Sequence, residues 1–543
     1  MNQTVNTVAL GLAYLALLSG IPCHASDSEP DQNAWTQFGP ARDWKIEHTV
    51  ATESKLIQCW KRDVGEGQSQ IVGRGDRIIV ASGSDEKMAD GSRKLITSFS
   101  AHSLAGGDQL WKFEVESRML DDQETFGGNR PRPQATPLLV GNNLIGLSFS
   151  GEVFCLNTKN GSKRWSMDLV KRFGAQAVQF GFSASPAAAP GATEEFVILA
   201  SGDSGGLCKL RADDGSLVWK APVASFSYAT PVFASLSGTD QWIVVSREHV
   251  LGLDHASGKE LWRHKLAEAG LTNVPCPLVV DENHILISGQ GVGGTRGMEI
   301  RRDAGQWVVK ETWFNRRLQF FYTNWTMLNT TVAMGCTLQY LTAFDVRTGE
   351  QLGRWRGYSD SNVMQFRDEL LVLGGKGKAH RMRLNKIDSE LTVEHSYEVA
   401  SGRCWVAPSQ IGERWFVRCG SQLQCLAFRP PLDEHEIEAS EISNQIARGE
   451  ELHLALIRTG LAADPVEQIL EAFDKQGQEA ALRLYAELRK ANKLTDTNYV
   501  ALAEAAYQIN QKGLAAQIMQ HAQADLPDSK AIQRKMAERS GKR

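Results

Sequence analysis

The sequence lacks the cysteine and histidine patterns that identify most metal and redox sites. Its nine cysteines include no adjacent pair, no CxxC and no CxxCH haem-attachment site. Its twelve histidines are scattered and show no spacing typical of metal ligands. We therefore predict no metal site, no covalently attached haem and no cofactor-binding residue.

An excess of charge of one sign is also lacking. The chain has 59 Lys and Arg against 63 Asp and Glu, a formal net charge of −4, and its basic residues are scattered rather than clustered. Nucleic-acid binding needs a basic patch or stripe. We therefore expect no nucleic-acid partner.

Long apolar runs are absent except for Val8–Ile21, which is too short to span a bilayer comfortably. Cys23-His24-Ala25 follows it as an acceptable small-residue cleavage site. We predict a secretory signal over residues 1–25, although its first segment, MNQTVNT, contains no Lys or Arg. A buried helix of the mature domain is the alternative. With the signal cleaved near Ala25, the mature chain has no transmembrane span and is periplasmic or secreted.

A thirteen-residue hairpin pattern recurs at least four times. Each copy reads as strand, polar turn and strand, with a glycine four residues before a final tryptophan. The glycine suits a left-handed turn conformation, which a side chain would disfavour. The copies are FSAHSLAGGDQLW ending at Trp111, VFCLNTKNGSKRW ending at Trp165, LCKLRADDGSLVW ending at Trp219 and VLGLDHASGKELW ending at Trp262.

The four tryptophans are spaced by 54, 54 and 43 residues. A period of roughly 40 to 50 residues that consists of strands is typical of β-propeller blades. Because one blade cannot bury both of its faces, we expect each tryptophan to wedge between neighbouring blades. Such burial contributes about 2–3 kcal/mol for each indole.

Three weaker copies of the hairpin fill later positions. Residues 341–355 place their tryptophan, Trp355, two residues late on the same strand face. In residues 298–313, Val309 stands at the expected tryptophan position. Residues 379–397 read as a further hairpin without a tryptophan.

The last hairpin is predicted to be split between the two ends of the domain. Leu423–Phe428 supplies its first half, and Leu56–Arg62 is expected to supply the second. Such a blade closes the ring and leaves no open sheet edge. We predict a mainly β fold in which residues 56–428 form an eight-bladed propeller, at about 47 residues for each blade. Seven blades are the alternative.

Export would permit disulfides, and two cysteine pairs are candidates. Cys404 and Cys419 flank the predicted turn IGER and could face each other across two strands. Cys59 and Cys425 could meet if the ring closes as predicted. Buried free thiols are the alternative for both pairs.

Two segments of different composition flank the propeller. Residues 26–55 are polar and are expected to form a loosely ordered extension, apart from the aromatic stretch Trp35–Trp44, WTQFGPARDW. Residues 433–543 are rich in Ala, Leu, Glu, Gln and Lys and have helical periodicity. We predict a small α-helical domain resembling a tetratricopeptide repeat, with one departure, because Tyr507 lies one residue later than the usual aromatic.

The hairpin repeat resembles that of the pyrroloquinoline-quinone-like (PQQ-like) propellers. WTQFGPARDW is similar to the segment that begins many secreted bacterial members, although it lacks the arginine usually found between Phe38 and Gly39. Residues 402–428, GRCWVAPSQIGERWFVRCGSQLQCLAF, resemble the closing blade of those members. The resemblance covers residues 35–428. The superfamily includes quinoprotein dehydrogenases and the outer-membrane-assembly lipoprotein BamB, so the resemblance specifies the fold better than the function.

Quinoprotein dehydrogenases carry a vicinal disulfide beside the quinone, a calcium site and an aspartate base. Here no cysteines are adjacent, and Asp213, Asp254 and Asp345 are turn residues of the repeat. The glycine-rich stretch Gly289–Gly297 lacks the Lys-Ser/Thr of a phosphate-binding loop. We predict no catalytic residue and favour an exported, non-catalytic scaffold for protein binding or envelope assembly. The alternative is a PQQ-dependent dehydrogenase acting on alcohols or sugars.

Two surfaces are candidates for binding a protein partner. One is the concave side of the helical tail, and the other is the propeller rim, where arginines lie in or near inserted loops. Ordinary solvation is the alternative for these arginines. The likeness to BamB suggests an association with outer-membrane machinery, at the level of the fold only. The rim arginines are Arg130, Arg132, Arg296, Arg301 and Arg302.

Overall fold

The computed structural model divides into two compact units, Met1–Arg429 and Pro430–Arg543, which we describe separately. The predicted signal, residues 1–25, lies outside the described residues. The structure describes residues 34–39, 45–46, 55–87, 93–117, 132–176, 180–202, 204–223, 227–266, 273–323, 325–337, 339–366, 369–383, 392–400, 404–429, 478–491, 493–496, 498–500, 502–503 and 512–539.

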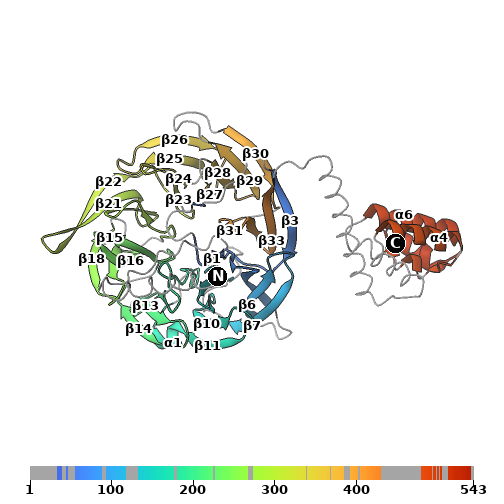
Figure 1. Ribbon diagram of the computed structural model, residues 1–543, viewed down its shortest axis with the longest axis horizontal. Helices are drawn as coiled ribbons and strands as arrows, with labels where there is room; N and C mark the ends of the chain where they lie inside the picture. Colours follow the sequence, from blue (N-terminus) through green and yellow to red (C-terminus); the bar gives the residue numbers. More distant parts are fainter. Residues whose placement is uncertain are drawn as a thin grey trace, which may run out of the picture. The chain divides into compact units, whose positions relative to one another are not determined.

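The first unit is an eight-bladed β-propeller (Figure 1). Eight sheets follow one another around a ring. Within each sheet, the strands are ordered from the axis of the ring to its perimeter. The prediction of a mainly β, eight-bladed propeller is confirmed, and the seven-bladed alternative is wrong.

The blades of the first half of the ring follow the chain in order. Blade 1 contains β1 (Ala34–Trp35), β4 (Val72–Arg74), β5 (Arg77–Lys87), β6 (Arg93–Ser103) and β7 (Gln109–Ser117). Blade 2 contains β8 (Leu138–Val140), β9 (Asn143–Leu147), β10 (Glu152–Asn157) and β11 (Lys163–Asp168), followed by the helix α1 (Leu169–Phe173). Blade 3 contains β12 (Glu195–Ala200), β13 (Gly206–Arg211) and β14 (Leu217–Ala221). Blade 4 contains β15 (Val232–Leu236), β16 (Thr239–Val245), β17 (His249–Asp254) and β18 (Glu260–Lys265).

The second half of the ring ends with the closing blade. Blade 5 contains β19 (Leu278–Val279), β20 (His284–Gly289), β21 (Gly294–Asp303) and β22 (Gln306–Asn315). Blade 6 contains β23 (Trp325–Met327), β24 (Val332–Thr337), β25 (Tyr340–Asp345) and β26 (Gln351–Arg356). Blade 7 contains β2 (Lys45–Ile46), β27 (Asn362–Phe366), β28 (Glu369–Leu373), β29 (Lys378–Arg383) and β30 (Thr392–Glu398). Blade 8 contains β31 (Ser409–Ile411), β32 (Arg414–Cys419), β33 (Gln422–Arg429) and β3 (Lys55–Asp63).

The repeated tryptophan couples one blade to the next at five junctions. Its indole N–H donates to the backbone carbonyl three residues before the turn glycine of the following blade. The ring then lies against that glycine, where a Cβ would collide with it. The five bonds are Trp60 to Leu104 (3.1 Å), Trp111 to Thr158 (3.1 Å), Trp165 to Ala212 (3.0 Å), Trp219 to His255 (3.2 Å) and Trp313 to Val346 (3.0 Å).

The predicted place of Val309 is wrong, because Trp313 occupies the tryptophan position of blade 5. Trp313 pairs with Gly297, next to a bulge in the strand pair of blade 5. Trp111 and Trp165 stand next to the equivalent bulges of blades 1 and 2. The hairpin of β21 and β22 has 10-residue strands, so its turn glycine no longer lies four residues before the tryptophan. Trp262, one blade earlier, donates instead to Gln241 Oε1 within its own blade at 2.6 Å.

The predicted split blade is present. Strand β3 pairs antiparallel with β33 from Lys55–Arg429 to Asp63–Gln422, and Trp60 takes the tryptophan position opposite Cys425. Arg418 of β32 then joins blade 8 to blade 1, donating to Ala81 O at 2.6 Å and to Gly65 O at 2.8 Å. Burial lowers the pKa of Arg418 to about 10, so the guanidinium stays charged at neutral pH.

The second unit contains the helices α4 (Gln478–Lys490), α6 (Lys512–Asp525) and α7 (Lys530–Arg539). A small apolar core includes Leu488, Tyr499, Met519 and Ala522. Tyr507, on which the tetratricopeptide comparison depends, lies outside the described residues, so repeat identity remains a prediction. In the part of the chain that the structure describes, no helix is long and apolar enough to cross a bilayer.

Candidate functional site

The centre of the ring contains part of the chain's own N-terminal segment. Strand β1 pairs with β4, the inner strand of blade 1, in the register Ala34–Arg74 and Trp35–Gly73, and it lies near the middle of the ring (Figure 1). Trp35 is buried. Strand β2, ten residues further along the chain, pairs with β27 of blade 7. The described part of the predicted extension is therefore built into sheets on two sides of the axis.

Residues 36–39 continue this segment past the inner ends of blades 1 to 3. Thr36 O accepts from Leu139 N of blade 2 at 2.7 Å, and Gln37 Oε1 accepts from Ala188 N of blade 3 at 2.9 Å. Gly39 N donates to Gln70 Oε1 of blade 1 at 2.8 Å. These bonds satisfy inner-strand groups that would otherwise face the axis unpaired.

Hydroxyl groups link the inner ends of neighbouring blades. The backbone N–H of one blade donates to a side-chain hydroxyl at the equivalent position in the next blade. The three bonds are Gln70 N to Thr136 Oγ1 (2.9 Å), Thr136 N to Ser185 Oγ (2.9 Å) and Ser185 N to Thr230 Oγ1 (3.0 Å).

This row of hydroxyls was not predicted, although the sequence contains a signal for it. Ala-Thr-Pro at 135–137, Ala-Ser-Pro at 184–186 and Ala-Thr-Pro at 229–231 recur once per blade. Pro-Cys-Pro at 275–277 continues the pattern in blade 5, where Cys276 replaces the hydroxyl residue. The proline suits the start of an inner strand, where no ladder N–H is needed.

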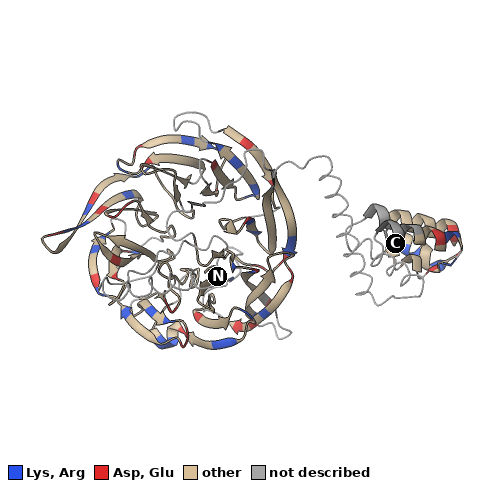
Figure 2. Ribbon diagram, viewed as in Figure 1, with Lys and Arg blue, Asp and Glu red and all other residues tan. Residues whose placement is uncertain are grey.

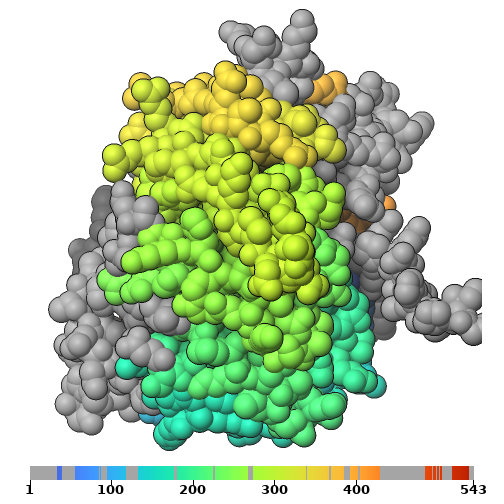
Figure 3. Space-filling model, turned by 90° about the vertical axis from the view of Figure 1, so that its left-hand side faces the viewer, coloured from blue at the N-terminus to red at the C-terminus, as the bar shows by residue number. Residues whose placement is uncertain are grey.

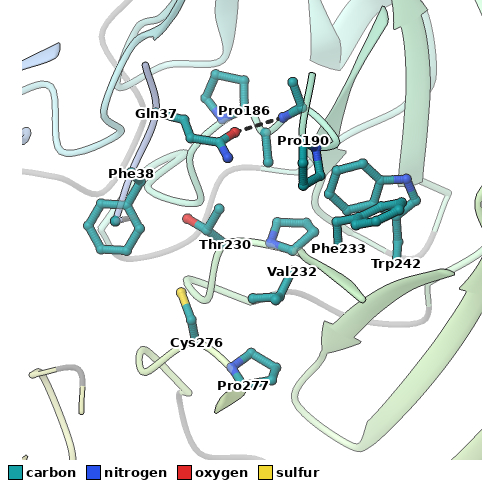
Figure 4. A pocket seen from close by; sticks show the side chains of 14 residues that line it. Gln37, Phe38, Pro186, Pro190, Thr230, Val232, Phe233, Trp242, Cys276 and Pro277 are labelled. Atoms are coloured by element: carbon teal, nitrogen blue, oxygen red, sulfur yellow. Dashed lines mark hydrogen bonds between the residues drawn. The ribbon is translucent and has the colours of Figure 1, made fainter. Parts of the chain in front are cut away.

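A small cavity of about 50 Å³ lies between this N-terminal segment and the inner ends of blades 3 to 5 (Figure 4). Gln37 and Phe38 border it on one side, and prolines and small apolar residues border most of the rest. Thr230, Cys276 and Trp242 supply its other polar side chains. Burial raises the pKa of the Cys276 thiol to about 12, so the group stays protonated and is a poor nucleophile.

The cavity residues do not fit a quinone cofactor. Pockets for organic ligands usually measure about 300–1,000 Å³, whereas this one has room for a few water molecules. Its lining contains no charged side chain that could pair with the carboxylates of pyrroloquinoline quinone. Among the described residues, no group of three or more His, Cys, Asp or Glu could hold a metal ion.

Asp213, Asp254 and Asp345, taken as turn residues, belong to the turns between paired outer strands. Asp254 Oδ1 accepts from Ser257 N at 2.8 Å, and Asp345 Oδ1 accepts from Arg347 N at 2.7 Å. The Asp254 pKa is lowered, first by its bond to the Ser257 hydroxyl. Both carboxylates thus act as hydrogen-bond acceptors that hold the turn.

A second cavity, of about 260 Å³, lies between turns of blades 1 and 2. Arg74, Arg77 and Lys159 border it. Arg74 donates to Gly141 O at 3.2 Å, and Arg77 donates to Lys159 O at 3.1 Å. The two arginines therefore bind backbone carbonyls of the next blade and hold the junction together.

Two of the predicted rim arginines are tied into the structure. Arg132 forms an ion pair with Glu66 at 2.7 Å. Arg296 is buried, pairs with Glu311, and lies over the ring of Phe314 with its guanidinium carbon 4.1 Å from the centroid. Arg130 lies outside the described residues. Acidic and basic residues are spread over all sides of the ring, in agreement with the scattered charge of the sequence (Figure 2).

Arg301 and Arg302, the remaining two, lie near the tip of the hairpin of β21 and β22. This hairpin continues beyond the bulge with five more residue pairs than the neighbouring blades have, from Glu299–Lys310 to Asp303–Gln306. At about 3.3 Å for each residue, the extension is about 17 Å long. It projects past the perimeter of the ring (Figure 1), on the side of the molecule that faces the viewer in Figure 3.

The root of this hairpin is packed, whereas its tip is free. Ile300 is buried in the apolar core that joins blades 4 and 5, and Trp307 and Val309 pack against that core. All residues from 301 to 306 are exposed. Arg301 pairs with Asp303 at 2.9 Å, so the tip presents a charged and rigidly supported surface.

Comparison with known proteins gives one family match, over the hairpin repeats of blades 1 to 6. Residues 92–354 match the family described as outer membrane protein assembly factor BamB. None of the curated proteins searched matches the chain.

Solved structures also match the chain, and three of them are as follows. BamB from Moraxella catarrhalis is 14% identical, with 70% of this chain and 100% of that chain covered and a TM-score of 0.35. The quinohemoprotein alcohol dehydrogenase from Comamonas testosteroni is 10% identical, with 74% and 82% covered and a TM-score of 0.48. The Pan2 WD40 domain from Neurospora crassa is 11% identical, with 71% and 98% covered and a TM-score of 0.37.

Proposed function

Since this chain belongs, through the repeats of residues 92–354, to the BamB-like family of PQQ-repeat propellers, we propose that it is an exported, non-catalytic scaffold that binds proteins of the cell envelope. The proposal depends mainly on the hairpin of β21 and β22. The root of this hairpin packs in the core, but a propeller that only needed to close that core would have no use for the exposed tip, residues 301–306.

The charged, solvent-exposed tip of this hairpin suits a protein partner better than a small molecule. Residues 301–306 are exposed at the tip of a projecting hairpin, whereas a small ligand would need a concave site. Arginine is enriched at protein interfaces, where its planar guanidinium makes several hydrogen bonds at once. Arg302 lies over Trp307, with its guanidinium carbon 6.0 Å from the ring centroid, which limits its freedom before binding.

Export is supported by the disulfide between Cys404 and Cys419. The two cysteines face each other across the closing blade, as one of the two predicted pairs. Disulfides persist in oxidising compartments and are rare in the cytosol. Together with the predicted signal over residues 1–25, this bond supports a periplasmic or secreted location.

The alternative, a PQQ-dependent dehydrogenase acting on alcohols or sugars, has less support. The axial cavity is small and uncharged, and part of the N-terminal segment occupies the axis beside it. The test is to add pyrroloquinoline quinone and calcium to the purified protein and to follow dye reduction with a panel of alcohols and sugars. Turnover above the protein-free rate would replace the scaffold proposal.

The scaffold proposal is tested by shortening the hairpin. In the test variant, residues 299–310 are replaced by the turn Asp254–Lys259 of blade 4, which removes the five extra pairs. In the control variant, the hairpin of blade 5 is left intact and the turn Asp254–Lys259 of blade 4 is replaced by Asn157–Ser162 of blade 2, a turn of the same length. Partners are captured from envelope extract by crosslinking and identified by mass spectrometry.

We expect the shortened variant to lose at least tenfold of the captured partner, while the control variant and a variant ending at Arg429 retain it. All variants must keep the thermal unfolding profile of the propeller. Equal capture by the shortened and full-length proteins would exclude the hairpin as the docking element. If the variant ending at Arg429 alone lost the partner, the helical unit would carry the function.

A further inference from the structure

The closing blade contains four of the chain's cysteines, in two pairs. Cys404 and Cys419 form the disulfide described above. Cys59 and Cys425 are both in the thiol form, on the paired strands β3 and β33. The other cysteines of the described residues that form no disulfide lie apart from one another, in blades 2, 3, 5 and 6: Cys155, Cys208, Cys276 and Cys336.

A bulge brings Cys59 beside Cys425. The register of β3 on β33 passes from Gln58–Leu426 directly to Trp60–Cys425. Cys59 is the extra residue, so Cys59 and Trp60 share the place opposite Cys425. The two thiols are hydrogen-bonded to each other. Cys59 is next to Trp60, the residue directly opposite Cys425. A disulfide requires Cα atoms about 4.4–6.8 Å apart, a separation that spans two neighbouring antiparallel strands.

We propose that Cys59 and Cys425 form a reversible disulfide that joins the first and last strands of the propeller. The structure holds the reduced form. The oxidant is a disulfide supplied by a dithiol–disulfide exchange protein or by a small disulfide such as oxidised glutathione. Neither Cys59 nor Cys425 takes part in the docking hairpin, so the inference is independent of the proposed function.

Cys59 is the first sulfur to react, because it is partly exposed whereas Cys425 is buried. The Cys59 thiolate attacks one sulfur of the oxidant, and the other sulfur leaves and takes up a proton. The Cys425 sulfur then attacks Cys59 and expels the second thiol. In total, two protein thiols lose two electrons and two protons, and the disulfide of the oxidant becomes two thiols.

The surroundings of Cys425 suit the second step of this sequence. Its hydrogen bond to Cys59, followed by burial, raises the pKa of the Cys425 thiol, which keeps it protonated in the reduced pair. Reaction of Cys59 removes that hydrogen bond. Arg414 Nη1 lies 3.7 Å from Cys425 Sγ and favours the thiolate at that point.

The bond would add a covalent link at the seam between β3 and β33, which strand pairing and side-chain contacts otherwise hold closed. Residues 59 and 425 enclose all eight blades, so the disulfide turns the propeller into one covalent loop. A crosslink that closes a long loop restricts the unfolded chain strongly. Oxidation is therefore expected to raise the unfolding temperature by several degrees.

The test uses the full-length protein, equilibrated in glutathione buffers of increasing oxidised fraction, alkylated, digested and mapped by mass spectrometry. We expect the reduced protein to be alkylated at both Cys59 and Cys425, and the oxidised protein to yield one crosslinked peptide containing both. The rise in unfolding temperature on oxidation should occur in the wild type and in C155S, which removes a buried thiol of blade 2. It should be absent in C59S and C425S.

Three outcomes would overturn the proposal. Both thiols could remain alkylatable in excess oxidised glutathione, Cys59 could stop at the mixed disulfide with glutathione, or Cys59 could crosslink two chains instead. The mapping of the wild-type protein decides among these results even if a serine variant fails to fold. The Cys404–Cys419 peptide serves as the internal standard for an intact disulfide.

Discussion

At the scale of single residues, Trp111 shows how one side chain holds two blades together. Its indole N–H donates to Thr158 O at 3.1 Å, and its ring lies against Gly161 of the next blade. Gly161 has a φ of 71°, a conformation that glycine adopts without strain. The glycine therefore has two functions, to form the turn and to leave room for the indole.

Substitution of Gly161 by Ala is expected to destabilise the propeller by about 2–4 kcal/mol, since it combines an unfavourable φ with a steric collision. A Cβ at this position would lie 2.5 Å from Trp111 Cε3. Gly191 is the matched control because its φ is 73° and a Cβ there would meet nothing within 4 Å. We expect G191A to cost about 1 kcal/mol. Urea unfolding followed by tryptophan fluorescence measures the free energy of unfolding of both variants. An equal loss of stability in G161A and G191A would show that the indole contact is unimportant.

A residue of blade 7 shows where the repeat pattern is insufficient. Arg381 stands at the hairpin position that holds Ala101 in blade 1 and Ala343 in blade 6. It is fully buried and is paired with Glu369 at 2.6 Å. A large charged residue fits there only because a carboxylate from the neighbouring strand compensates its charge. One repeat position, read in isolation, cannot reveal such a partner.

At the scale of elements, the outer hairpins could be predicted from sequence because each is a local unit. Its turn glycine and tryptophan lie within 13 residues, so the pattern is legible in one stretch of chain. The split blade was predictable for the same reason, since two half-patterns remained at the ends. The extended hairpin of blade 5 was misjudged because extra pairs moved Trp313 away from its turn.

The inner parts of the molecule could not be predicted in the same way. The bond from Ala188 N to Gln37 Oε1 joins residues 151 positions apart, and the bonds from backbone N–H groups to hydroxyls join different blades. Such contacts exist only once the ring has closed. The short N-terminal strand β1 has only two residues, too few for any periodic signal.

The N-terminal segment should protect the inner strands from solvent. We expect the double variant W35A/Q37A to detach residues 34–39, because it removes the buried indole and the acceptor for Ala188 N. Amide hydrogen exchange at Leu139 and Ala188 should then become roughly tenfold faster, equivalent to the loss of about one hydrogen bond each.

The amide of Ile243 is the control, since it lies in the interior strand β16 of blade 4, between β15 and β17. Its exchange should not change in the double variant. Uniform acceleration at all three amides would indicate global destabilisation instead of local detachment of the segment.

At the scale of the whole molecule, the ring depends on a single closing strand. Strand β3 covers the edge of β33, places Trp60 against Gly107 of blade 1, and brings the ring of Trp60 to 5.7 Å from that of Phe416. Removing β3 would expose the edge of β33 and take away the contact of Trp60 with blade 1. Exposed edges of this kind favour aggregation.

The position of β3 in the chain should matter less than its presence in the sheet. Lys55 and Arg429 are opposite each other at the end of the β3–β33 ladder, so an Asn-Gly turn could join them directly. We compare three proteins: residues 55–429 in their natural order, residues 64–429 alone, and residues 64–429 followed by Asn-Gly and residues 55–63. The rearranged protein should be monomeric and unfold within a few degrees of the first, because every strand pair is kept, whereas the protein without β3 should aggregate. Size-exclusion chromatography measures the oligomeric state of the three proteins, and thermal circular dichroism measures their unfolding temperatures. If the protein without β3 were soluble and unfolded cooperatively, seven blades and a partial eighth would be sufficient to close the ring.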